Sequence, residues 1–208
     1  MSKKLWTNIA AIGMMLLLGA GLFMAFSAEP ADDMAYFPLE TGNQWAYLSV
    51  YFDNTKFRED LIVDKPDNGT LRLMVFSNAN PVAEIHFQRN KDGLLKTKEI
   101  SGAGVAKYEP AQLSLASKLK AGVTWKWKSA EGKAKYSSKV LNGGKITVPA
   151  GTFDTLLIRT EGVSEAGEDY LDETWYAKGT GYVKSVVTIG DKKKVDELVE
   201  FKVGQKTK

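Results

Sequence analysis

Cysteine is absent from this chain of 208 residues, and histidine occurs only once, at His86. Without cysteine the protein forms no disulfide, offers no thiolate as a metal ligand or nucleophile, and lacks the residue that carries the lipid of a lipoprotein. A zinc site needs three or four nitrogen, sulfur or carboxylate ligands, so a single histidine argues against zinc. The fold must therefore be stabilised by packing.

The chain also lacks an excess of charge of either sign. Its 28 Lys and Arg residues and 25 Asp and Glu residues give a formal net charge of +3, and two positive charges belong to Lys3 and Lys4. The remainder carries about +1, which gives no electrostatic signature for a polyanion, so nucleic acid is not expected as a partner. The length and the hydrophobic content of 44% fit one domain with a sizeable core.

The N-terminal segment is the one long apolar run. Lys3 and Lys4 precede a nearly uninterrupted apolar stretch over residues 9–26, which ends at the small residues Ser27 and Ala28. A basic head, an apolar middle and small residues at the end are typical of a secretory signal peptide. About 18 apolar residues also reach the lower limit for a spanning helix. Residues 1–28 are therefore predicted to be a cleaved signal peptide or an uncleaved anchor, followed by a linker over 29–35.

From Tyr36 to the C-terminus the pattern predicts one all-β or mainly β domain. Short strands alternate with Gly-, Asn- and Asp-containing turns at the spacing of sandwiches and barrels. The segment 111–119 is the exception, and it is interpreted as a short helix or a loop. The expected strands cover residues 44–52, 57–64, 70–76, 83–88, 93–100, 124–129, 133–141, 145–148, 153–161, 169–177, 182–189 and 193–203.

Two strands carry more detailed signals. In the last strand the inward-facing set changes parity around Leu198, which predicts a bulge or bend there. In the strand 124–129, Trp125 and Trp127 share one face and Lys126 and Lys128 the other. This alternation favours tryptophans in a core over a ligand-stacking platform, because the lysines would lie on a solvent-exposed face of the sheet and the tryptophans on the other face.

The two halves of the domain share three landmarks in the same order, at separations that grow from about 80 to about 88 residues. This pattern predicts two duplicated meanders, with pseudo-repeats over 36–100 and 116–203, although chance among common hairpin residues remains the alternative. Trp45 and Trp125 would be equivalent buried anchors after Gly42 and Gly122. The paired landmarks are 39–47 with 119–127, 69–71 with 151–153, and 87–96 with 176–184.

No catalytic, cofactor-binding or metal-binding residue is predicted, and the ligand-binding residues are left undefined. His86 lies on the strand face opposite Ile85 and Phe87 and is interpreted as a solvated surface residue, since the chain has no G-x-S-x-G elbow. The glycines Gly102 and Gly104 lack the context of a phosphate loop. An acidic patch lacks the spacing of a calcium loop and is interpreted as a hairpin with a charged strand beyond it. Its members are Glu165, Glu168, Asp169, Asp172 and Glu173.

Three motifs resemble a recurrent domain of bacterial secreted proteins and lipoproteins of unknown function. They are Y-F-P-L-x-x-G-N-x-W at 36–45, V-P-A-G-T-F at 148–153 and W-Y-A-x-G-x-G at 175–181. The resemblance implies a strongly curved antiparallel sheet, similar to the half-barrels of lipoprotein carriers, and a location in the cell envelope. It implies no active site. Attachment through a lipidated cysteine is excluded here, because the chain has none.

These observations favour a non-enzymatic envelope protein, periplasmic or at the cell surface, that binds an apolar ligand, a lipid or an envelope partner on a curved sheet. A structural or assembly module of the envelope is the alternative, and a hydrolase with acidic catalysis is a weaker third. No cofactor is expected. A concave groove would favour the first interpretation, whereas a filled core with an exposed apolar patch would favour the second.

We expect the mature protein outside the cytoplasmic membrane with its N-terminus at Ala28 or Glu29, because the apolar segment ends in small residues there. Cell fractionation followed by mass spectrometry of the N-terminal peptide checks both points. An intact chain in the membrane fraction would show the anchor instead. Full-length protein in the soluble cytoplasm would contradict export.

Overall fold

A computed structural model of the protein describes residues 32–64 and 70–204. The segment 1–28, expected to be a signal peptide or anchor, and the expected turn at 67–69 lie outside these residues. The described chain forms one antiparallel sheet in the strand order β6-β5-β4-β3-β2-β1-β12-β11-β10-β9-β8-β7, which confirms the all-β prediction. Among the described residues, no helix is long and apolar enough to cross a membrane.

Each half of the chain is a six-stranded meander, and the two meanders join where β1 pairs with β12. The first comprises β1 (Gln44–Val50), β2 (Lys56–Asp64), β3 (Leu71–Ser77), β4 (Asn80–Asn90), β5 (Gly93–Ser101) and β6 (Gly104–Ala116). The second comprises β7 (Thr124–Lys128), β8 (Lys135–Val148), β9 (Gly151–Val163), β10 (Asp169–Ala177), β11 (Gly181–Ile189) and β12 (Lys192–Lys202).

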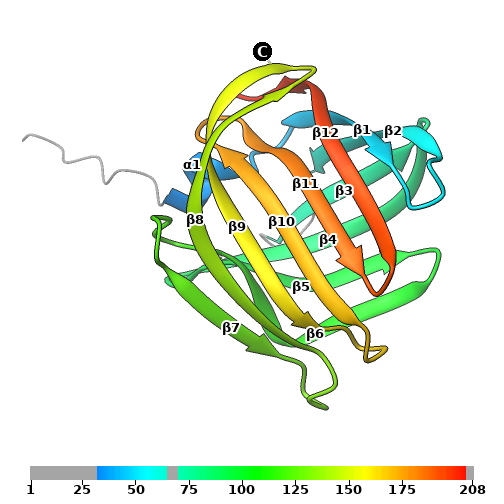
Figure 1. The fold of residues 1–208 in the computed structure, drawn as a ribbon, viewed down its shortest axis with the longest axis vertical. Coiled ribbons are helices and arrows are strands. Elements are labelled where there is room, and N and C mark those ends of the chain that lie inside the picture. Colours follow the sequence, from blue (N-terminus) through cyan, green and yellow to red (C-terminus); the bar gives the residue numbers. More distant parts are fainter. Residues whose placement is uncertain (1–31, 65–69, 205–208) are drawn as a thin grey trace, which may run out of the picture.

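The sheet curves back on itself until its two edge strands meet, as the prediction of a strongly curved sheet requires. In Figure 1 the strands of the second half lie in front and β3, β4 and β5 lie behind them. The edges β6 and β7 are joined by side chains: the indole Nε1 of Trp125 donates to the carbonyl of Leu113 at 2.9 Å, and Nε1 of Trp127 donates to that of Pro110 at 2.7 Å. We call this contact the seam.

The segment 111–119, expected to be a helix or a loop, is for the most part strand, and that prediction was wrong. Residues 111–116 form the end of β6, where Leu94 of β5 pairs with Leu115. Leu113 and Leu115 alternate with Gln112 and Ser114, which is the period of a strand with one apolar face. The sequence fits an imperfect helical period as well, but hydrogen bonding to β5 makes this segment a strand.

A bulge lies where the last strand was expected to bend. Along β1, Ala46 faces Glu200 and the next residue, Tyr47, faces Leu198. Val199 is therefore the extra residue of the bulge, and the prediction of a parity change around Leu198 is confirmed. The side chains of Tyr47 and Leu198 are fully buried as a result.

The expected linker over 29–35 is structured where it is described. Residues Asp32–Tyr36 form a short helix, α1, which lies across one end of the interior (Figure 1). Asp33 is fully buried and forms an ion pair with Arg89. The amide of Gly179 donates to the carbonyl of Ala35 at 2.6 Å. The polar sequence predicted a linker, but Arg89 offsets the cost of burying the Asp33 charge.

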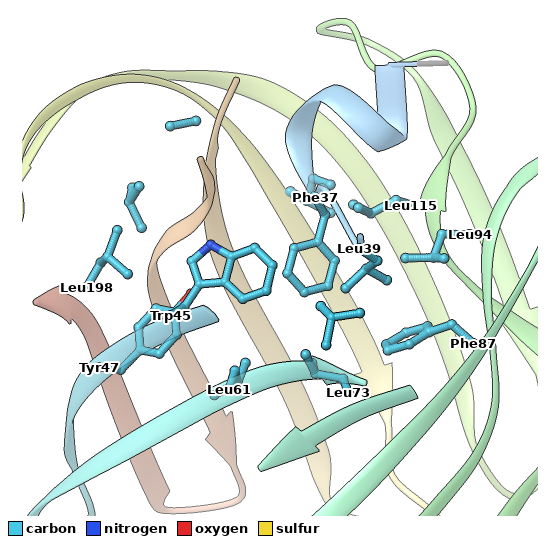
Figure 2. Close-up of a cluster of buried hydrophobic side chains, with 14 of the residues drawn as sticks. Phe37, Leu39, Trp45, Tyr47, Leu61, Leu73, Phe87, Leu94, Leu115 and Leu198 are labelled. Carbon is cyan, nitrogen blue, oxygen red and sulfur yellow. The ribbon is translucent and has the colours of Figure 1, made fainter. Parts of the chain in front are cut away.

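The apolar core gathers beneath α1. Figure 2 shows Phe37 beside Trp45, with Leu94 and Leu115 across from them. The rings of Phe37 and Trp45 lie 5.4 Å apart between centroids, and the indole of Trp45 donates to the carbonyl of Thr180. One end of the interior is therefore filled.

The two glycine turns have the same geometry. Gly42 and Gly122 have φ of 90° and 95°, and their amides donate to the carbonyls of Val63 and Val140 at 2.9 and 2.8 Å. The tryptophans that follow differ, because Trp45 is 1% exposed and Trp125 is only partly buried. Trp125, which lies at the seam, is therefore the less buried of the two expected anchors, although it also packs against the core. The duplication itself stays a prediction.

Replacing Trp45 by Ala should lower the free energy of unfolding by about 3–5 kcal/mol, as for other buried aromatic residues. Trp125→Ala should cost clearly less, since part of its ring already contacts water. Urea unfolding followed by circular dichroism measures both values. Equal losses would show that the seam stabilises the fold as much as the core does.

Candidate functional site

The concave face of the sheet carries an unusual row of polar side chains, which we call the polar belt. It crosses β1, β12, β11, β10, β9 and β8, where each member is a cross-strand or same-face neighbour of the next. Most members are buried, although the interior of a sheet this size is normally apolar. The polar belt consists of Ser49, Asp196, Ser185, Thr174, Asp172, Thr160 and Ser138.

At one end of the polar belt, two carboxylates are ion-paired with one lysine. The ammonium of Lys194 donates to Glu59 Oε2 at 2.7 Å and lies 3.2 Å from Asp196 Oδ1. The hydroxyl of Ser49 donates to Asp196 Oδ1 at 2.6 Å. Burial lowers the pKa of Lys194, but the carboxylates of Asp196 and Glu59 outweigh it and hold that pKa above its usual value. Both carboxylates at this end therefore have a cationic partner within the protein.

The other end of the polar belt holds Asp172, whose carboxylate has no cationic partner. Thr174 donates its hydroxyl to Oδ1 at 2.6 Å, and the Tyr170 hydroxyl donates to Oδ2 at 3.4 Å. No ion pair among the described residues includes Asp172. Burial raises the pKa of Asp172 to about 6, and the two hydroxyl donors and Lys96 lower it only in part.

A cavity of about 280 Å³ lies against Asp172. Its lining divides by chemistry, because β2 to β6 supply mostly apolar side chains and β8 to β10 supply polar ones. The apolar part includes Leu61, Leu73, Ile85, Phe87, Leu94, Leu113 and Leu115, with Phe37 from the segment after α1. The polar part includes Lys96, Gln112, Ser114, Ser138, Thr160, Tyr170 and Asp172. The cavity is thus suited to an amphipathic molecule.

Lys96 is the cation of this cavity, and its charge already has partners. Its ammonium lies 3.4 Å from Glu99 Oε2 and 4.2 Å from the centre of the Tyr108 ring. The hydroxyl of Tyr108 donates to the same Glu99 oxygen at 3.2 Å. Lys96 therefore does not form a direct ion pair with Asp172.

A row of aromatic rings runs from the seam to Asp172. Neighbouring ring centroids are 6.0 Å apart for Tyr108 and Trp127, 5.5 Å for Trp127 and Tyr136, and 4.8 Å for Tyr136 and Tyr170. Gly162 pairs with both Tyr136 and Tyr170. A Cβ at Gly162 would lie 1.8 Å from the carbonyl oxygen of Lys135, so only glycine fits there. The row ends at Tyr170, which donates to Asp172.

A second depression, of about 350 Å³, lies on the convex face around β1, β2 and β12. Its charged residues are paired with one another: Arg58 lies 2.8 Å from Asp60 and 3.5 Å from Glu200. Both carboxylates of this depression thus have a cationic partner, unlike Asp172, so the concave cavity is the stronger candidate site.

His86 is not a solvated surface residue, and that prediction was wrong. It lies on the strand face opposite that of Phe87, as expected. Its side chain is only 14% exposed, however, with Nε2 3.7 Å from Glu84 Oε2. Burial, and then the charge of Lys98, lower its pKa. The cross-strand neighbours Arg72 and Lys98 flank it. Among the described residues no group of three His, Cys, Asp or Glu residues could hold a metal ion.

The acidic patch expected from the sequence is divided by the fold. Glu165 and Glu168 lie in the β9–β10 turn, where Ser164 donates to the carbonyl of Glu168 at 2.9 Å. Glu173 has its carboxylate 3.5 Å from Arg159, while Asp172 faces the cavity. Asp172 was not among the residues predicted to form a site. The spacing places Tyr170, Asp172 and Thr174 on one strand face, but it does not say whether that face is the inner one.

No protein-family model and no curated protein matches the sequence. Two solved structures are similar in outline. One is a Bacteroides fragilis protein assigned as exported, with a YmcC-like fold; it is 12% identical, with a TM-score of 0.46 over 81% of this chain and 99% of that one. The other is a Parabacteroides distasonis protein assigned as a lipoprotein, 13% identical, with a TM-score of 0.43 over 81% and 98% of the two chains. Similarity at this level carries no information on function, and the resemblance of the motifs stays a prediction.

Replacing Asp172 by Asn should stabilise the protein at neutral pH. The folded state holds the Asp172 proton more tightly than the unfolded state, so the partly desolvated charge is a cost above a pH of about 6 that disappears as the pH falls toward 4. We expect Asp172→Asn to raise the free energy of unfolding by about 1–3 kcal/mol near pH 7.5 and by little near pH 4. Urea unfolding at the two pH values measures this.

The matched control for that experiment is Glu173→Gln, on the neighbouring position of the same strand. Its carboxylate is on the solvent side and belongs to an ion pair with Arg159 at 3.5 Å, so its loss should change stability by less than about 0.5 kcal/mol. An Asp172→Asn effect that is the same at both pH values would contradict a buried charge.

Proposed function

We propose that the protein acts outside the cytoplasmic membrane as a non-enzymatic binder of a small amphipathic molecule, which it holds in the cavity against Asp172. The location rests on the basic, apolar and small-residue parts of segment 1–28. The observation that carries the binding proposal is a partly buried carboxylate that lines a cavity and has no cationic partner. Such a group costs stability unless something pairs with it.

The dimensions of the cavity favour a small ligand. A volume of about 280 Å³ lies near the lower end of ligand-pocket volumes. It suits a single short chain or ring and is too small for a lipid with two acyl chains. The leucines and Phe87 on one wall would contact the apolar part of the ligand. The hydroxyls of Thr160 and Ser138, which lie 2.8 Å apart, would contact the polar part.

A docking or assembly role is a second candidate, favoured by an exposed apolar cluster. Phe52 is 58% exposed, and Tyr51 and Val82 are 39% and 41% exposed. All three line one shallow depression beside the β1–β2 loop. Exposed apolar clusters of this kind are common at contacts between proteins.

Native mass spectrometry of the protein purified from its own envelope tests the binding proposal. The wild-type protein should retain a small molecule. Leu113→Trp places an indole ring at the cavity wall and should abolish retention. Leu48→Trp is the control, because it makes the same change at a residue that is 37% exposed and outside the cavity lining. Circular dichroism confirms that both variants fold. A bare wild-type chain, or retention by Leu113→Trp, would contradict the proposal.

A further inference from the structure

The charges inside the sheet do not balance. Glu59 and Asp196 share the single ammonium of Lys194, at 2.7 and 3.2 Å. On the other side of the interior, Lys96 contacts Glu99 at 3.4 Å. Asp172 is left with hydrogen bonds from hydroxyls only. The net charge of these groups is therefore negative, and among their carboxylates Asp172 alone has no ion pair and lines the cavity.

The groups around Asp172 are arranged for a donor with several hydrogens. Thr160 is its direct cross-strand partner on β9, and Ser138 is the partner of Thr160 on β8. Tyr170 lies two residues away on the same strand face. Hydroxyl oxygens accept hydrogen bonds as well as donating them. An ammonium in the cavity could thus donate to the carboxylate and to a neighbouring hydroxyl at once.

We infer that the molecule bound in this cavity is a primary or secondary amine, held by an ion pair between its ammonium group and the Asp172 carboxylate. The inference rests on the proposed function and adds the chemical class of the ligand. An alkyl or aryl body attached to the ammonium lies against Leu73, Ile85 and Phe87 on the facing wall. A carboxylate ligand would be repelled by Asp172, and a neutral alcohol would leave its charge without a partner.

Binding of three eight-carbon probes tests the inference: octylamine, 1-octanol and octanoate, titrated by calorimetry into the full protein after dialysis. Each has eight carbon atoms, one of which is the carboxylate carbon in octanoate, and they differ in the charge of the head group. We expect octylamine to bind at least about tenfold more tightly than octanol, which corresponds to about 1.4 kcal/mol, and octanoate to bind most weakly.

Two variants assign the preference to one carboxylate. Asp172→Asn keeps the shape of the side chain and should reduce the preference for octylamine over octanol to less than about twofold. Glu173→Gln removes a carboxylate from the adjacent residue, whose ion pair with Arg159 lies outside the cavity. This control should keep the full preference.

The outcomes separate the two proposals. Equal binding of the three probes, lost in Leu113→Trp, would overturn the amine ligand and leave the binding function standing. Tighter binding of octanoate would overturn it too, and would assign recognition to Lys96. A preference for octylamine that persists in Asp172→Asn would also overturn it. No binding of any probe would overturn both proposals.

Discussion

The pairing of β1 with β12 joins the two halves of this molecule, and the other features of the interior depend on it. The ladder runs from Gln44 opposite Lys202 to Val50 opposite Val195. Side chains extend this join to β11: the rings of Tyr47 and Tyr182 stack at 4.3 Å, and the Tyr47 hydroxyl donates to the carbonyl of Tyr182 at 2.9 Å. Because the first and last strands lie at the middle of the sheet, both meanders can curve toward each other and enclose a common interior.

That interior is divided into layers along the strands. Beneath α1 it is apolar and filled, around Trp45 and Phe37. One step further along the strands it becomes polar, and the cavity lies where the two layers meet. The filled layer supplies most of the stability through burial of apolar area. This allows the polar layer to retain a carboxylate, at Asp172, that does not contribute to the stability of the fold.

The sequence predicted the strands well and the site poorly, for physical reasons. Period-two alternation and glycine turns are local signals, and they located most strands and the bulge at Val199. For β6 the helical and strand periods competed, and only pairing along β5 decided between them. Asp172 and Glu173 are equally acidic neighbours, so alternation alone does not say which one faces inward. Which residue faces inward depends on how the whole sheet curves. That curvature follows from pairing between distant strands, such as β1 with β12, and no local pattern contains it.

The seam affects how copies of this protein behave toward one another. An exposed sheet edge offers unpaired amide and carbonyl groups on which strands of other molecules can add, and this is a common route to aggregation. Here the only two edges of the described sheet face each other, and the indoles of Trp125 and Trp127 donate hydrogen bonds to carbonyls of β6. The contact that covers these edges therefore rests on hydrogen bonds from two side chains, since no backbone ladder joins β6 to β7.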